Sequence, residues 1–181
     1  MTPDLFSPLE LRDSTAPNRV MVSPMCQYSV DERDGVPTDW HRTHLASRAV
    51  GGAGIVMSEA TAVEPRGRIS PEDTGIWSDE HVEAWRPITE FISKQGAIPA
   101  IQLAHAGRKA AKSRPWEGSE PVQPDDGGWE TIGPSETVWP YDDPAPPHRR
   151  MDSDDIEDVI ESFRTGAENA LEAGFGIAEV H

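Results

Sequence analysis

The chain has 181 residues, of which 36% are hydrophobic and 27% are charged, enough for one globular core or for a substantial part of a larger one. Its formal net charge is −16, and a surface that acidic repels a phosphate backbone, which argues against nucleic acid as a partner. No apolar run approaches the roughly 18 residues of a membrane span, and the N-terminus has no secretory signal, so we expect a cytoplasmic protein without membrane contact.

Four short apolar runs recur along the chain, and we predict that each is a β-strand. They are nearly continuous in apolar character instead of alternating, which is typical of strands covered on both faces. The runs lie at residues 19–24, 54–60, 97–105 and 176–181. Before the first of them, residues 5–13 are predicted to form a small hairpin that closes one end of the sheet.

Helical patterns lie between the predicted strands, and the first two have clear start signals. A helix over about 39–50 follows a capping residue at Thr38 and ends in the glycine-rich stretch 51–54. A second helix, over about 79–95, follows Ser78 and has acidic residues in its first turn. Its apolar side chains fall on roughly one side, at Val82, Trp85, Ile88 and Ile92.

The third helical pattern follows the acidic stretch 152–155 and stops at Gly174. Its apolar residues recur at spacings of three and four, which is the period of a helix face. They are Ile156, Val159, Ile160, Phe163, Ala167, Ala170 and Leu171. Because strands and helices alternate along the chain, we predict right-handed crossovers and a parallel sheet.

These elements predict an α/β fold that forms the N-terminal half of a (βα)8 TIM barrel. Such a barrel takes about 250 residues, and four strands with three helices are nearly half of one. The chain also stops on a predicted strand with no helix after it, so we interpret residues 1–181 as the N-terminal part of a single barrel domain. A long loop at about 106–150, rich in proline and tryptophan, is typical of a functional or partly disordered segment.

Ligands of parallel α/β folds bind at the carboxyl ends of the strands, so the residues there are the candidates for a site. The predicted strand ends contribute a thiol, a small side chain, an amide and an imidazole, a mixture that suits a planar polar ring better than a phosphate or a metal. We therefore predict no metal site. The candidates are Ser23, Pro24, Met25, Cys26, Tyr28, Glu59, Ala60, Gln102, His105 and His181.

Five blocks of sequence cover almost the whole chain in order: "LFSPLELRDSTAPNRVMVSPMCQYS", "GGAGIVMSEATAVEPRGRIS", "DTGIWSDEHVEAW", "IQLAHAGRKA" and "GFGIAEVH". Together they resemble the old yellow enzyme family, most closely its cysteine-bearing, thermophilic-like branch of ene-reductases. The resemblance implies an FMN-containing barrel that takes hydride from NAD(P)H and reduces the C=C bond of activated alkenes. It also implies a small enone-type substrate, such as an α,β-unsaturated carbonyl, and a homo-oligomer for the complete protein.

The resemblance also implies a role for each candidate. Tyr28 and His181 line the substrate pocket, and His181 is the catalytic donor to the carbonyl oxygen, where negative charge builds up as hydride reaches the β-carbon. Gln102 can donate and accept at the pyrimidine edge of the flavin, and Cys26 tunes the reduction potential of the ring. The implied FMN contacts are Ser23, Pro24, Met25, Cys26, Ala60 and Gln102.

Several parts of the family's site fall outside these 181 residues: its second pocket donor, its tyrosine proton donor, its flavin-facing arginine and its phosphate-binding loops. We therefore expect the chain to be inactive on its own.

The residues alone leave two other functions open. One is a non-redox barrel enzyme such as a Schiff-base aldolase, which needs a lysine at a strand end, whereas the lysines here are Lys94, in a predicted helix, and Lys109 and Lys112, in the loop. The other is a non-enzymatic half-barrel that self-associates through its exposed strand edges.

Two smaller questions also stay open. His105, Arg108 and Lys109 follow the third predicted strand, where they either touch the active site or order the loop. His41 and His44 are three residues apart on a predicted helix, but no third metal ligand is evident near them.

Overall fold

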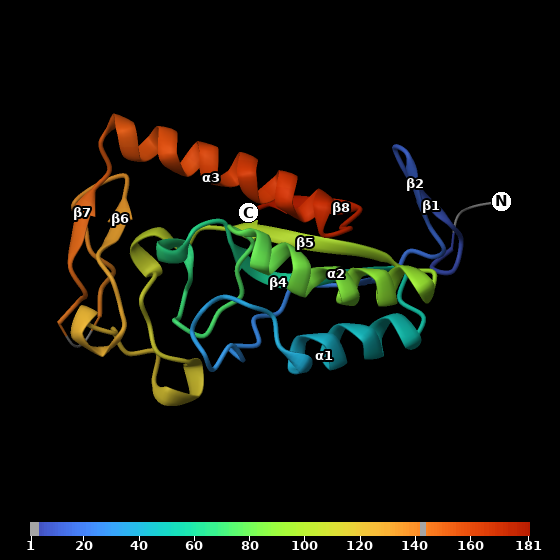
Figure 1. Ribbon diagram of the computed structural model, residues 1–181, viewed down its shortest axis with the longest axis horizontal. Coiled ribbons are helices and arrows are strands. Elements are labelled where there is room, and N and C mark those ends of the chain that lie inside the picture. Colours follow the sequence, from blue (N-terminus) through green and yellow to red (C-terminus); the bar gives the residue numbers. More distant parts are fainter. Residues whose placement is uncertain (1–3, 142–143) are drawn as a thin grey trace.

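The computed structural model describes residues 4–141 and 144–181, and at its centre lies a four-stranded parallel sheet (Figure 1). The strands, in spatial order, are β3 (Met21–Val22), β4 (Ile55–Ala62), β5 (Ile98–Ala104) and β8 (Ile177–Val180). Each of the four predicted runs overlaps one of them, although β4 extends two residues beyond its run, and the pairing is parallel throughout, as predicted. The first run is shortened, because the chain leaves the ladder at Ser23 and Pro24 has no N–H to continue it.

The helices are α1 (Asp39–Val50), α2 (Asp79–Lys94) and α3 (Ser153–Glu172), close to their predicted bounds. The first two begin with the same arrangement. The backbone N–H of Thr38 donates to Nδ1 of His41 at 2.9 Å, and that of Ser78 donates to Nδ1 of His81 at 3.2 Å. A histidine therefore takes the place that glutamate usually holds in a capping box.

The main core lies between the three helices and one face of the sheet. Trp85 of α2 is fully buried there, with its indole N–H donating to the carbonyl of Gly75 at 3.1 Å. Its ring meets Phe175 edge-on at 5.5 Å between centroids. All four apolar residues predicted on one side of α2 are buried, so that helix face is confirmed. The same cluster includes Leu45 of α1 and Ala170 of α3.

The opposite face of the sheet has a smaller apolar cluster, which the N-terminal hairpin covers. The hairpin consists of β1 (Leu9–Leu11) and β2 (Ser14–Ala16), with Leu9 opposite Ala16. Both side chains pack against Ile55, Met57 and Ala100, near the amino ends of β4 and β5. The predicted hairpin thus closes one end of the sheet, although its strands lie a few residues later than the stretch 5–13.

The predicted third helix is confirmed as α3, and the apolar residues that recur along it are only partly buried. Ala170 is buried and Phe163 packs on the core, but Ile160 is 65% exposed and Leu171 is 75% exposed. The helix approaches the rest of the protein closely at Gly166, where a Cβ would lie 2.9 Å from Cγ1 of Val63.

The long segment between β5 and α3 contains short elements that the sequence did not predict. They are β6 (Thr131–Gly133), β7 (His148–Arg150) and 3-10 turns at Gly107–Lys109, Pro115–Glu117 and Pro124–Asp126; another such turn, Pro65–Gly67, follows β4. β6 and β7 pair in parallel, and Arg149 of β7 forms an ion pair with Asp155 of α3. Residues 142–143 of this segment lie outside the described residues. No helix in the described ranges is long and apolar enough to cross a membrane.

Candidate functional site

Three of the strands bring side chains together near their carboxyl ends. Ala60, Gln102 and Glu179 are directly paired across β4, β5 and β8, so their side chains share one face of the sheet. Gln102 is 7% exposed and donates from Nε2 to Oε1 of Glu179 at 3.0 Å. We call these three paired residues, Ala60, Gln102 and Glu179, the rung. Because Ala60 contributes only a methyl group, the rung leaves a half-buried surface beside the fixed amide of Gln102.

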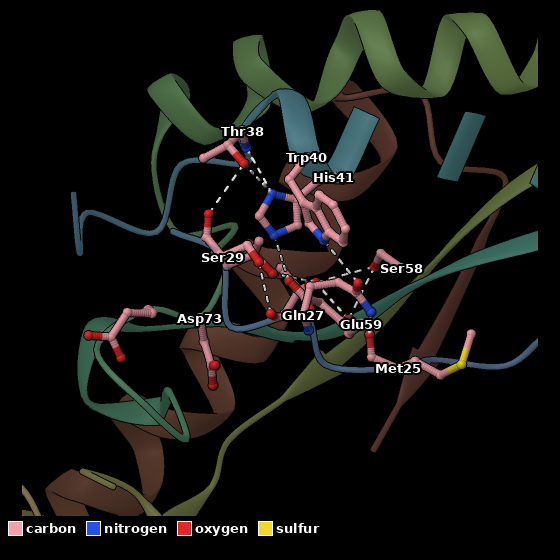
Figure 2. Close-up of polar contacts among 12 residues, drawn as sticks. Met25, Gln27, Ser29, Thr38, Trp40, His41, Ser58, Glu59 and Asp73 are labelled. Atoms are coloured by element: carbon pink, nitrogen blue, oxygen red, sulfur yellow. Dashed lines mark hydrogen bonds and ion pairs between the residues drawn. The ribbon is translucent and has the colours of Figure 1, made fainter. Parts of the chain in front are cut away.

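A shift in register between Met57 and Ala60 gives Glu59 a separate role. Its side chain is 3% exposed, and Oε1 lies 3.0 Å from Nε2 of His41 in α1, although the two are not aligned as a hydrogen bond. The other oxygen accepts the backbone N–H of Gln27. Figure 2 shows Glu59 between the imidazole and the loop that follows β3.

This loop, residues 23–30, is held by a chain of polar contacts around Gln27. The side chain of Gln27 donates to the carbonyl of Met25 at 2.7 Å and accepts from the indole N–H of Trp40 at 3.0 Å. Its own carbonyl accepts the hydroxyl of Ser29 at 2.8 Å. These contacts fix a backbone that includes a left-handed residue, Tyr28, with φ of 51°. Non-glycine residues in that conformation are uncommon and cluster at functional sites.

Cys26 lies half-buried in the same loop, next to the hydroxyl of Tyr28 and the backbone N–H of Ala60. Burial, together with the negative charges of Asp73 and Glu59, raises the pKa of the Cys26 thiol to about 12. Burial and the neighbouring Cys26 also raise the pKa of Tyr28. At neutral pH the thiol is therefore protonated, which makes it a poor nucleophile and leaves an S–H that can donate weakly.

A cavity of about 490 Å³ opens at this edge of the sheet. Of the residues given a role by the family resemblance, it brings together Ala60 and His181, whereas the other predicted FMN contacts and Tyr28 lie outside its lining. His181 is exposed, with Nδ1 3.6 Å from Oε1 of Glu179. Besides those two residues, the lining includes Ile69, His105, Arg108, Lys109 and Lys112.

His105 combines the two roles that the sequence left open. It lines the cavity, and it also orders the surrounding loops, because its Nε2 lies 2.7 Å from Oε1 of Glu64 and its Nδ1 accepts the backbone N–H of Gly107 at 3.0 Å. Burial alone would raise the pKa of Glu64, but its bonds to His105 and Arg66 outweigh that effect and lower it. This imidazole is therefore held in one orientation at the cavity wall.

Sequence reasoning missed the roles of His41, Glu59 and Glu179. A signal was present for Glu59, because an acid inside the apolar run "GIVMSEA" must find a partner once it is buried. His41 was considered only as a metal ligand, whereas it caps α1 and faces Glu59. Among the described residues, no three His, Cys, Asp or Glu side chains gather as a metal site would require.

Comparison with known proteins places this geometry in a family. The NADH:flavin oxidoreductase / NADH oxidase family matches residues 4–181. Among curated relatives, the NADPH dehydrogenase of Geobacillus sp. (strain WCH70) is 44% identical over 98% of this chain and 47% of its own length. That of Bacillus subtilis (strain 168) is 39% identical over 100% of this chain and 48% of its own length. The chain belongs to the NADH:flavin oxidoreductase / NADH oxidase family.

Solved structures give the same answer for the fold. The old yellow enzyme homologue from Zymomonas mobilis superposes with a TM-score of 0.81 at 32% identity, over 99% of this chain and 48% of that one. Morphinone reductase in complex with tetrahydroNAD gives 0.80 at 30% identity, over 99% and 49%. The chain thus spans about half the length of the relatives it matches. The predicted family and the predicted half of a TIM barrel are both confirmed.

The described residues fit the FMN that the family name implies. The paired rung offers a small side chain beside a fixed amide that can donate and accept, and the adjacent thiol is protonated and uncharged. A planar ring with alternating polar edge atoms matches that set of groups. The predicted cofactors, FMN with NAD(P)H, agree with the family and with the NADPH dehydrogenases among its members.

Proposed function

We propose that the protein is an FMN-dependent oxidoreductase that uses NADPH to reduce the C=C bond of activated alkenes, and that this chain supplies one side of its active site. The observation that supports this most is the rung Ala60–Gln102–Glu179, which lies beside the Cys26 loop at the carboxyl edge of a parallel sheet. The relatives named NADPH dehydrogenase support the choice of reductant. The enone-type substrate comes from the family resemblance.

In this proposal each side chain has a separate task. FMN, when bound, would supply the hydride. Gln102 would hold the polar edge of the ring, Ala60 would leave room for its face, and the neutral thiol of Cys26 would donate to it without adding charge. His181, at the mouth of the cavity, would donate to the carbonyl oxygen of the alkene, where a positioned donor stabilises the charge that develops. Tyr28 would border the substrate from the Cys26 loop.

The direct test is product formation by the complete, FMN-loaded protein. We expect 2-cyclohexenone to be reduced to cyclohexanone with one NADPH consumed for each product. With NADPH deuterated at C4, deuterium should appear at the β-carbon of the product. Oxidation of NADPH without any reduced alkene would contradict the alkene part of the proposal.

The 181-residue chain on its own is expected to bind FMN weakly, with Kd above about 10 μM, and to show no alkene reduction. The reason is that its proposed flavin contacts all lie on one side and are partly open to solvent: Ser23 is exposed and Met25 is 45% exposed. Titration followed by flavin fluorescence measures this. One-to-one binding below 1 μM would contradict the expectation.

Replacing Cys26 by alanine is expected to shift the midpoint potential of the bound flavin while FMN stays bound. The thiol is a neutral donor near the proposed ring position, and its loss changes the stabilisation of the ring without removing Gln102 or Ala60. A spectroelectrochemical titration of the complete protein gives the potential. An unchanged midpoint would exclude the tuning role.

We also propose that the complete protein is a homo-oligomer in the cytoplasm. Size-exclusion chromatography with light scattering tests the first part, and a monomeric mass would contradict it. The rival half-barrel that self-associates predicts association of the 181-residue chain itself in the same measurement.

A further inference from the structure

The cavity lined by Ala60 and His181 has a basic rim, which we define as Arg108, Lys109 and Lys112. Arg108 and Lys109 lie in the 3-10 turn just after β5, and Lys112 follows three residues later. The backbone N–H of Lys112 donates to the carbonyl of Ile69 at 2.9 Å, which fixes this segment to the loop after β4. The rim is therefore part of the cavity wall.

This rim stands out against the composition of the chain. The formal net charge is −16, yet two of the three lysines, Lys109 and Lys112, border this one cavity. An acidic protein surface repels an anionic ligand. A local group of cations at the binding site offsets that repulsion. The third lysine, Lys94, lies on α2 and pairs with Glu90 at 3.4 Å.

One aromatic ring gathers the three cations. The ring centroid of Trp139 lies 4.5 Å from Nζ of Lys109, 5.2 Å from Nζ of Lys112 and 5.6 Å from Cζ of Arg108. Cation–π contacts of this kind hold the side chains near the ring. Arg108 also donates to the carbonyl of Thr137 at 3.3 Å, which limits its freedom further.

The three cations of the basic rim form no ion pair with a carboxylate in the described part of the chain. Over residues 4–141 and 144–181, no carboxylate lies within 4.0 Å of a charged nitrogen of Arg108, Lys109 or Lys112. Burial, and then the charge of Lys109, lower the pKa of Lys112. Like charges held together in this way are relieved when an anion binds between them.

We propose that the basic rim binds the phosphate groups of the nicotinamide dinucleotide. The inference rests on the proposed function, because it places the dinucleotide in the cavity that Ala60 and His181 line. The cavity has an apolar part, with Ile69 and Ala60, and a cationic part at the rim. A reduced dinucleotide has a similar division, an uncharged dihydronicotinamide and several phosphate charges, whereas an anionic alkene brings a single carboxylate for three cations.

The test is equilibrium binding of NADP⁺ to the complete FMN-loaded protein, measured by titration calorimetry so that no turnover is needed. The double variant Lys109→Gln/Lys112→Gln is expected to raise the Kd for NADP⁺ at least about tenfold, because charge-assisted contacts to phosphate are lost. The affinity of the parent protein should also fall as salt rises. If the double variant loses affinity for NADP⁺ but not for NAD⁺, the rim binds the 2′-phosphate. If it loses affinity for both equally, the rim binds the pyrophosphate.

The matched control is Lys94→Gln, which removes the same charge from a side chain that is 72% exposed on α2, and its Kd should equal that of the parent. If the double variant fails to fold, the single variant at the exposed Lys109 takes its place. An unchanged Kd in a folded variant would overturn the inference, as would a loss confined to an anionic alkene. If such a variant still reduces 2-cyclohexenone with NADPH, only the rim assignment fails and the proposed function stands.

Discussion

Replacing Glu59 by alanine is expected to lower the free energy of unfolding by about 2–4 kcal/mol, because it removes a buried carboxylate and leaves the two polar groups that face it without a partner. The carboxylate accepts the backbone N–H of Gln27 and lies 3.0 Å from Nε2 of His41. Both partners would stay away from water after the change. The Cys26 loop would lose its anchor to β4, so flavin affinity should fall as well.

Urea unfolding of the complete protein measures the loss of stability, and flavin fluorescence measures the loss of affinity. The matched control is Glu83→Ala, which breaks the ion pair with Arg86 on α2 at a side chain that is 71% exposed, and should cost less than about 1 kcal/mol. Glu59→Gln should restore part of the loss, since its amide oxygen can still accept from Gln27. Equal costs for Glu59→Ala and Glu83→Ala would contradict the anchoring role.

Replacing His181 by alanine is expected to lower kcat/KM for 2-cyclohexenone about 10²–10³-fold, the usual effect of removing one donor to a developing oxyanion. The side chain is 65% exposed at the cavity and lies outside the Ala60–Gln102 rung, so FMN should bind as in the parent. His181→Asn keeps an N–H donor and should recover part of the rate.

Steady-state kinetics with a separate FMN titration separates these effects. The control is His44→Ala, a half-buried histidine of α1 outside the cavity, which should leave kcat/KM unchanged. If His181→Ala reduced the alkene as fast as the parent, the donor assigned to this site would be wrong.

Much of the fold could be predicted because local signals and packing agree. The bounds of α1 follow from a cap and a glycine stop, and the apolar side of α2 packs around Trp85 as its spacing indicates. The apolar spacing located α3, but it does not report which of these side chains the rest of the structure covers. Ala170 is buried, whereas Ile160 is exposed.

The site was predictable in part for a similar reason. Strand ends and the family resemblance pointed to Ala60, Gln102 and His181, and the structure places the first two on one rung and His181 at the adjoining cavity. The contact between Glu59 and His41 joins residues that are 18 positions apart, through a register shift that no local pattern encodes. The rim around Trp139 likewise depends on how the long segment folds back on the turn after β5.

The most direct test of the central claim is the absorbance of oxidised flavin in the complete protein, followed without oxygen. The account predicts that NADPH bleaches this band, and that 2-cyclohexenone, added after the NADPH is used up, restores it with one reduced product per flavin. A band that NADPH does not bleach, or one that stays bleached after the alkene is added, would contradict it.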